Sequence, residues 1–220
     1  MSNYCIKYGR DARVKYISHL DFVRMFHRAV RRSGVQFVFS QGFNPHPIMT
    51  VAVPLSVGVT ADGEYIKVGF DTDLSEEEIK NALNSALPKG FFVSTVALAE
   101  GKKPDFNAID AAEYIIDAES AMPDAFDAAS LLAGSELIVM KKSKSGEKET
   151  NIRPLIYSIE RIPPVAGNLG LRIVCAAGTR ATLKPETVIA AINKYQPQTE
   201  IGFFSTHRKA LMDNKFNELL

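Results

Sequence analysis

The chain has 220 residues, of which 46% are hydrophobic and 23% charged, and its net charge is +1. These values are typical of a globular protein and exclude a disordered or fibrous chain. No apolar run reaches the roughly 20 residues of a membrane span, and the N-terminal segment lacks a secretory signal. The sequence therefore predicts a cytoplasmic protein with no membrane partner.

The charge is unevenly distributed along the chain. Residues 1–60 carry a net charge of +6, residues 61–136 carry −11, and residues 137–220 carry +6. A local field steers a charged partner even when the total charge is near zero. The pattern indicates either an anionic partner for the basic segments or internal ion pairs with the acidic middle.

The two cysteines, Cys5 and Cys175, lie far apart in strand-like segments, which predicts buried thiols in a reducing compartment. Two thiols are too few to hold an iron–sulfur cluster, and no pair of histidines has zinc spacing. The sequence predicts no metal site and no cofactor in this chain.

Hydrophobic periodicity predicts the elements of the first half. The predicted strands cover residues 3–9, 35–40, 63–70 and 91–97, and the predicted helices cover residues 19–33 and 76–87. Ser75 and Glu78 have the spacing of a capping box, which marks the start of the second helix.

The first of these helices has an unusual polar face. It gathers four arginines and no lysine: Arg24, Arg28, Arg31 and Arg32. The planar guanidinium suits phosphate and carboxylate. The face therefore predicts contacts with RNA phosphates, with ion pairs to the acidic middle of the chain as the alternative.

A stiff polar loop, residues 40–47 with the sequence SQGFNPHP, follows this helix, and its two prolines exclude regular structure. We expect the loop to pack beside the N-terminal end of the helix, with Asn44 or His46 close to Asp21 or His19. The alternative for Asp21 is a helix cap with Ser18. Three side chains are weak candidates for acid–base groups: His19, Asp21 and His46.

The second half repeats the pattern of the first. Its predicted strands cover residues 113–118, 136–142, 170–176 and 200–206, and its predicted helices cover residues 124–133 and 186–195. Five positions recur at a constant offset of 109 residues: Leu74/Leu183, Ile79/Val188, Leu83/Ile192, Asn84/Asn193 and Pro88/Pro197. We therefore predict an α+β fold in which two ferredoxin-like (βαββαβ) units with antiparallel sheets, residues 1–100 and 110–220, form a tandem duplication.

The second half also contains basic segments. Residues 141–150 predict a hairpin tip that is either a solvated turn or a basic clasp for a nucleic-acid backbone. The segment 123–132, which takes the place of the arginine helix, is acidic. The candidate nucleic-acid-binding residues of the whole chain are Arg24, Arg28, Arg31, Arg32, Gln41, Asn44, His46, Lys141, Lys142, Lys144, Arg153 and Arg180.

Several motifs together resemble the radical SAM-linked protein family of bacteria. They are the arginine helix from His19 to Arg32, the SQGFNPHP loop, Asn-Ile-Arg-Pro at residues 151–154 and Gly-Thr-Arg at residues 178–180. The resemblance spans nearly the whole chain and implies a radical SAM protein as partner, but it assigns no catalytic residue. Asn151 stands where the family pattern has an acidic residue, which puts an essential carboxylate at that position in doubt.

Together, these observations predict an accessory module that binds structured RNA (tRNA or rRNA) and works with a separate radical SAM modification enzyme. Two alternatives remain open. One is an enzyme acting on RNA, such as an endoribonuclease or a protein similar to pseudouridine synthases. The other is a protein-only scaffold for the radical SAM partner.

Overall fold

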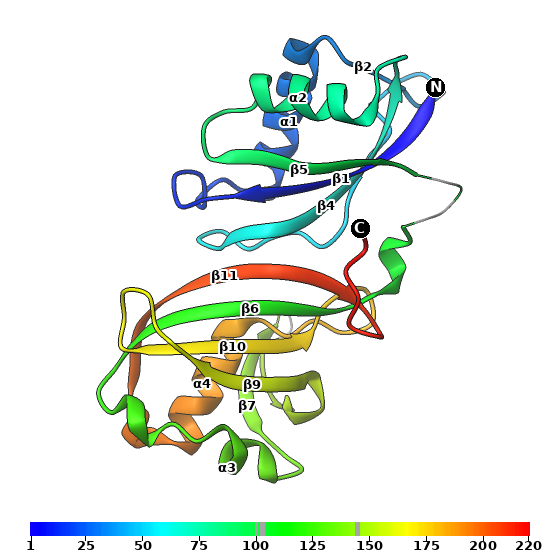
Figure 1. The fold of residues 1–220 in the computed structure, drawn as a ribbon. Helices are drawn as coiled ribbons and strands as arrows, with labels where there is room; N and C mark the ends of the chain where they lie inside the picture. The colour runs from blue at the N-terminus through cyan, green and yellow to red at the C-terminus, as the bar shows by residue number, and fades with distance from the viewer. Residues whose placement is uncertain (100, 102–103, 144–145) are drawn as a thin grey trace. The chain divides into compact units, whose positions relative to one another are not determined.

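The computed structural model describes residues 1–220 except residues 100, 102–103 and 144–145. The chain divides into two compact units, drawn with their elements in Figure 1. The first comprises Met1–Ala108 and Asn217–Leu220, and the second comprises Ile109–Phe216. Each combines α-helices with antiparallel strands, so the predicted α+β class is confirmed.

The sheet of the first unit is built around β1 (Ser2–Arg10), which pairs with β4 (Thr60–Asp71) on one side and with β5 (Phe91–Leu98) on the other. Two short strands, β2 (Gln36–Phe37) and β3 (Met49–Val51), also pair with β4. The predicted strand over residues 35–40 is thus only two residues long. The Val38 amide still donates to the Gly69 oxygen of β4 (2.9 Å), and the next bridge joins Phe39 to Pro47 within the following hairpin.

Helices α1 (His19–Ser33) and α2 (Glu76–Ala86) cover one face of this sheet, as Figure 1 shows. The apolar side of α1 contributes Phe22, Phe26 and Val30 to the core, while α2 contributes Ile79 and Leu83. The Ser75–Glu78 capping box is confirmed at the start of α2. The core of the first unit therefore lies between the two helices and the sheet.

Part of the first unit comes from the far end of the sequence. Glu218 forms an ion pair with Lys7 of β1, and it also accepts a hydrogen bond from the Tyr65 hydroxyl of β4. Residues 217–220 therefore pack with the first unit rather than with the second half, from which they follow in sequence.

The second unit has a corresponding sheet order. Its first strand, β6 (Ile109–Ser120), lies between β10 (Leu169–Ala176) and β11 (Ile201–Asp213), and β9 (Ile156–Ile162) pairs with the outer side of β10. Helix α4 (Pro185–Tyr195) begins with proline at the first helical position, as expected, and packs buried residues against the sheet.

One predicted strand of the second half lies outside the main sheet. The predicted strand 136–142 corresponds to β7 (Ile138–Ser143), which pairs with β8 (Gly146–Asn151) in a separate two-stranded hairpin. The position at the edge of the main sheet is taken by β9, which the sequence did not predict. Periodicity alone does not identify a strand's partner, because pairing is a tertiary property.

The remaining elements of the second unit are short. The helix predicted over residues 124–133 is divided into the 3-10 helix η2 (Pro123–Ala125) and the α-helix α3 (Ala128–Ala133). The other 3-10 helices are η3 (Arg153–Leu155) and η4 (Pro197–Thr199), while η1 (Phe106–Ala108) belongs to the first unit.

Both cysteines are free and buried, as predicted. Burial raises the pKa of the Cys5 thiol to about 12, so this side chain stays protonated at neutral pH. None of the helices in the described part of the chain combines the length and the apolar character that crossing a bilayer requires.

Candidate nucleic-acid interface

The N-terminal end of α1 is closed by Ser18 and Asp21. The Ser18 hydroxyl accepts a hydrogen bond from the Asp21 amide (3.2 Å) and donates one to the Asp21 carboxylate (2.8 Å). Ser18 is thus the N-cap of the helix, and Asp21 is its partner in the first turn, which is the structural alternative considered for Asp21. The adjacent Arg24 guanidinium lies 3.3 Å from the same carboxylate.

Three of the four arginines of α1 are exposed to solvent and have no backbone partner within the part of the chain that the structure describes: Arg24, Arg28 and Arg31. Their spacing of four and three residues places them on one side of the helix over about 10 Å. Of these three arginines, Arg24 alone has a carboxylate partner among the described residues of the first unit, and that partner is Asp21 of its own helix. An exposed pair of this kind contributes little to stability. We call these three residues the arginine face.

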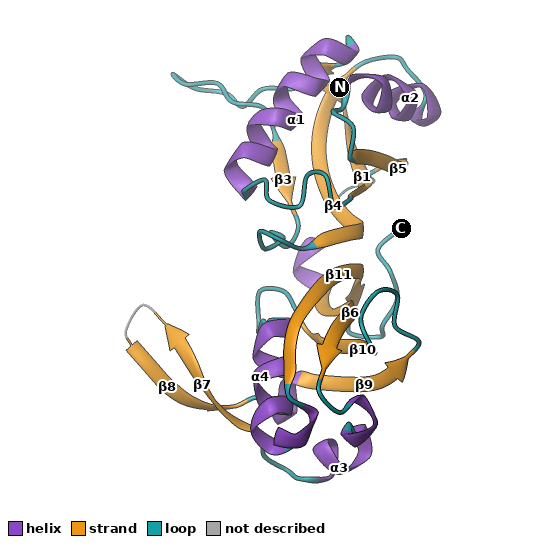
Figure 2. Cartoon of the chain, turned by 90° about the vertical axis from the view of Figure 1, so that its left-hand side faces the viewer, coloured by secondary structure: helices purple, strands orange, loops and turns teal. Residues whose placement is uncertain are grey.

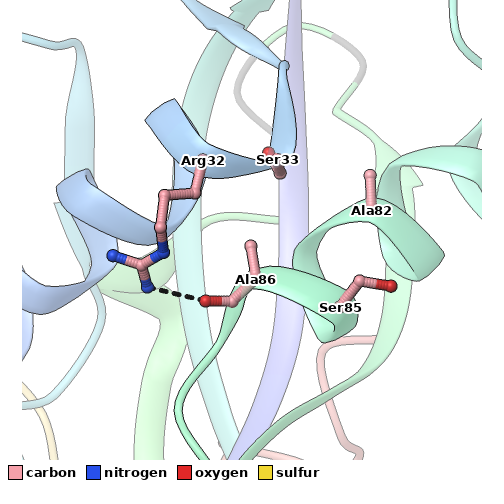
Figure 3. A pocket seen from close by; sticks show the side chains of 5 residues that line it. All are labelled: Arg32, Ser33, Ala82, Ser85 and Ala86. Atoms are coloured by element: carbon pink, nitrogen blue, oxygen red, sulfur yellow. Dashed lines mark hydrogen bonds between the residues drawn. The ribbon is translucent and has the colours of Figure 1, made fainter.

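Arg32 has a different role. Its guanidinium donates a 2.7 Å hydrogen bond to the backbone oxygen of Ala86, at the C-terminal end of α2. Figure 3 shows this bond at the rim of a small pocket that is also lined by Ser33, Ala82 and Ser85. Arg32 therefore connects the two helices, and a last-turn carbonyl of α2 gains a cationic partner.

The SQGFNPHP segment forms the tip of a closed hairpin. The Ser40 amide donates to the His46 backbone oxygen (2.9 Å), and one step further from the tip the Ile48 amide donates to the Val38 oxygen (2.9 Å). At the tip, Phe43 is fully exposed. We call residues 38–48 the loop hairpin; in Figure 2 the loop that leads into β3 extends beyond α1.

The contacts of His46 correct one expectation. Its ring nitrogen Nδ1 lies 2.9 Å from the Ser40 hydroxyl, and its amide donates to the same hydroxyl (3.1 Å), so His46 stabilises the loop hairpin itself. The base of the hairpin approaches the C-terminal half of α1, where the ring of Phe37 contacts that of His27. Among the described residues, His46 does not make the predicted contact with Asp21 or His19, because β2 follows directly from the C-terminal end of α1 and the His46 side chain is held by Ser40.

A pocket of about 380 Å³ lies where α1 meets the loop hairpin. It is lined by Arg31 and Gly34 at the end of α1, by Val35, Gln36 and Phe37, and by Phe39 of the hairpin. Phe37 is buried, whereas Phe39 is 43% exposed. The sequence did not single out Phe37 and Phe39, although their two-residue spacing places both on one side of an extended segment.

Next to this pocket, His27 is held in its neutral form. Burial, and then the positive charge of Arg31, lower the pKa of His27 from its ordinary value of 6.5. A histidine that is neutral at physiological pH adds no charge to the arginine face.

The candidate residues of the second unit have contacts within that unit. Arg153 donates to the backbone oxygens of Leu132 (3.0 Å) and Ile156 (3.3 Å), and Arg180 lies 2.7 Å from the Asp110 carboxylate. Asn151 accepts hydrogen bonds from the amides of Leu137 and Arg153, so it organises this turn without a carboxylate.

For the candidate lysines of the second unit, the structure describes the backbone of two residues. The backbones of Lys141 and Lys142 belong to β7, while Lys144 lies outside the described residues. Among the described residues, no group of three or more His, Cys, Asp or Glu side chains is arranged to hold a metal ion.

With this geometry described, the chain can be compared with known proteins. The family described as "Uncharacterized protein conserved in bacteria (DUF2344)" matches residues 3–185. The chain belongs to this family. No curated protein matches this chain.

Solved structures give similarity of fold for this DUF2344 protein. A chain in the crystal structure of a Cbf5–Nop10–Gar1 complex is similar with a TM-score of 0.51 and 9% identity, over 94% of the present chain and 48% of the other. The present chain thus spans about half the length of that relative, and at this identity the likeness concerns the fold alone. An unknown protein from Galdieria sulphuraria matches with 15% identity over 94% and 98% of the two chains, but with a TM-score of only 0.27.

Proposed function

We propose that this DUF2344 protein is an accessory module that binds structured RNA (tRNA or rRNA) through the arginine face and the loop hairpin. The observation that supports this most directly is the state of Arg28 and Arg31. Both are exposed, and neither has a carboxylate partner among the described residues of the first unit. Cations in this state are free to bind phosphate without breaking a contact in the fold.

The two parts of the surface have complementary chemistry. The arginine face offers about 10 Å of guanidinium groups for a phosphate backbone. The loop hairpin adds exposed amide side chains, Gln41 and Asn44, and the exposed ring of Phe43. RNA recognition commonly combines such phosphate contacts with aromatic and amide contacts to unpaired bases. This combination favours RNA over a purely acidic protein partner.

The other part of the proposal is a separate radical SAM enzyme as partner. It rests on the resemblance of the motifs to the radical SAM-linked family. Both cysteines of the chain are buried within their units, so they are not placed to ligate a cluster at the surface. In this arrangement the present chain holds the RNA and the partner carries the chemistry.

We also infer that the two units descend from one duplicated ferredoxin-like ancestor. Asn84 in α2 bonds both backbone groups of Val93 in β5 (2.8 and 2.9 Å), and Asn193 in α4 bonds both backbone groups of Ile201 in β11 (2.8 Å each). These asparagines are one of the pairs at the 109-residue offset. A shared contact between the last helix and the last strand of each unit supports a common origin.

The proposal is tested by measuring RNA affinity as a function of salt. The protein should bind tRNA or rRNA fragments, and log K should fall with log salt by about 0.7 to 0.9 for each phosphate contact. Arg28→Glu should weaken binding to RNAs of similar shape by a common factor. Arg161→Glu provides the matched control, because Arg161 is a half-exposed arginine of the second unit that pairs with Asp124.

Two results would contradict the proposal. One is a wild-type protein that ignores tRNA and rRNA fragments at low salt. The other is an equal loss of affinity in Arg28→Glu and Arg161→Glu, which would reflect net charge rather than a site. The partner is tested separately, by mass spectrometry of proteins that copurify with the chain from its native host.

A further inference from the structure

The pocket between α1 and the loop hairpin combines three kinds of group at one place. Arg31 supplies a cation at its rim, Gln36 supplies an amide that both donates and accepts hydrogen bonds, and Phe39 supplies an exposed ring. Its volume of about 380 Å³ falls within the range of roughly 300–1,000 Å³ that is usual for small-molecule sites. The pocket is therefore large enough for a group the size of a nucleobase.

The backbone around the pocket is also accessible. Gly34 ends α1 in the left-handed region (φ 81°), and no atom lies within 4 Å of the place where a Cβ would stand. At the end of a helix the last four carbonyl groups lack intrahelical partners and carry a partial negative charge. This environment attracts N–H groups, which nucleobases have at their edges and phosphates do not have.

We infer that this pocket receives one unpaired nucleotide of the bound RNA. Its base stacks on Phe39 with the base edge toward Gln36, and its phosphate lies toward Arg31. The inference rests on the proposed function and makes it more specific, because it adds a preference for RNA that offers an unpaired nucleotide. Stacking on an aromatic ring tolerates different bases, so the sequence preference depends on Gln36.

The environment of the pocket supports a base more than a second phosphate. His27, whose ring contacts Phe37, is kept neutral by burial and by Arg31, so it does not add a cation there. The neighbouring pocket beside Arg32 provides an internal comparison. It is smaller, about 280 Å³, its lining includes alanine and serine but no aromatic ring, and its arginine is bonded to Ala86.

The experiment uses the full-length protein and two RNA probes of equal length. One is a hairpin with a single 2-aminopurine in its unpaired loop, and the other is a fully paired duplex. Affinity is measured for both, and 2-aminopurine fluorescence reports stacking of the base. Phe39→Ala and Gln36→Ala remove pocket groups, while Phe203→Ala, the control, removes an exposed ring of β11 in the second unit, outside the proposed RNA surface.

Wild-type protein should prefer the looped RNA and quench its 2-aminopurine. Phe39→Ala should lower affinity for the looped RNA by roughly 5- to 150-fold, as removal of a stacking ring does, without changing affinity for the duplex. Gln36→Ala should lower it in the same selective way by a smaller factor. Arg28→Glu should lower the affinity for both RNAs by the same factor, because it removes a phosphate contact that both RNAs make.

The outcomes separate the two proposals. Equal affinity of the wild type for both RNAs, or equal losses in Phe39→Ala and Phe203→Ala, would overturn the base pocket while leaving RNA binding in place. A wild type that binds neither RNA would overturn the proposed function, and the base pocket with it. Thermal melting of each variant checks that the fold is retained, and Gln36→Ala, an exposed substitution, serves as the second variant if Phe39→Ala melts early.

Discussion

The helices that follow the first strand of each unit differ in length and in surface. Helix α1 has 15 residues and exposes the arginine face, while α3 has six residues, contains no arginine and follows the acidic residues Asp124 and Asp127. Both helices bury apolar side chains beneath them and both have a side-chain N-cap. The fold requires the buried side and the cap, whereas it does not require the arginines.

The same distinction separates individual arginines. Arg32 and Arg153 donate to backbone oxygens within their own units, so their loss would first affect the fold. Arg180 has an exposed pair with Asp110, which contributes little to stability. Arg28 and Arg31 have no such contact with a carboxylate in the described first unit. The comparison therefore separates the arginines bonded to the backbone of their own unit from a smaller, exposed set, to which the proposal assigns RNA binding.

The largest expected effect concerns the buried side of α1. Phe26 is 1% exposed, so Phe26→Ala should destabilise the protein by about 3–5 kcal/mol in urea unfolding. Arg28→Glu, two residues away on the exposed side of the helix, should change the free energy of unfolding by no more than about 0.5 kcal/mol. Comparable costs for the two variants would mean that the arginine face is part of the packing after all.

The next effect concerns the arginine face itself. Arg28→Glu/Arg31→Glu should reduce the slope of log K against log salt by about 1.4 to 1.8, the contribution of two phosphate contacts, and weaken RNA binding overall. Filter binding or anisotropy over a salt series measures both values. An unchanged slope together with a lower melting temperature would favour the alternative, in which these arginines form ion pairs with the acidic middle of the chain.

A smaller effect separates capping from binding. Ser18→Ala removes the side-chain acceptor for the Asp21 amide and should cost about 1 kcal/mol of stability, as loss of an N-cap does. RNA affinity at a temperature where the variant is folded should stay at the wild-type value. If affinity fell sharply with stability unchanged, Asp21 and Ser18 would belong to the RNA site instead.

The smallest expected effect is a dependence of stability on pH. The pKa of His27 is lowered in the folded state, so the unfolded chain binds more protons as pH falls below about 6.5. Stability should therefore fall as pH decreases from 6.5 toward the pKa of folded His27, and level off below it. Melting temperatures of the wild type and of His27→Gln across this range measure the effect, and equal pH profiles would contradict it.

The sequence by itself determined those features that depend on neighbouring residues. The bounds of α1, the Ser75–Glu78 box at α2 and the proline at the start of α4 follow from apolar spacing and from capping chemistry, which act within a few residues. The same short-range patterns indicated the arginines of α1 and the buried state of both cysteines.

Only the tertiary structure decided which segments meet. It pairs β7 with β8 instead of the main sheet, joins Asn217–Leu220 to the first unit, and brings Phe39 to Arg31 in one pocket while keeping His46 within its own hairpin. It also distinguished the arginines bonded inside a unit from those that are exposed. These features depend on contacts between residues far apart in sequence, and the free energy of such contacts is set by packing that no local pattern encodes.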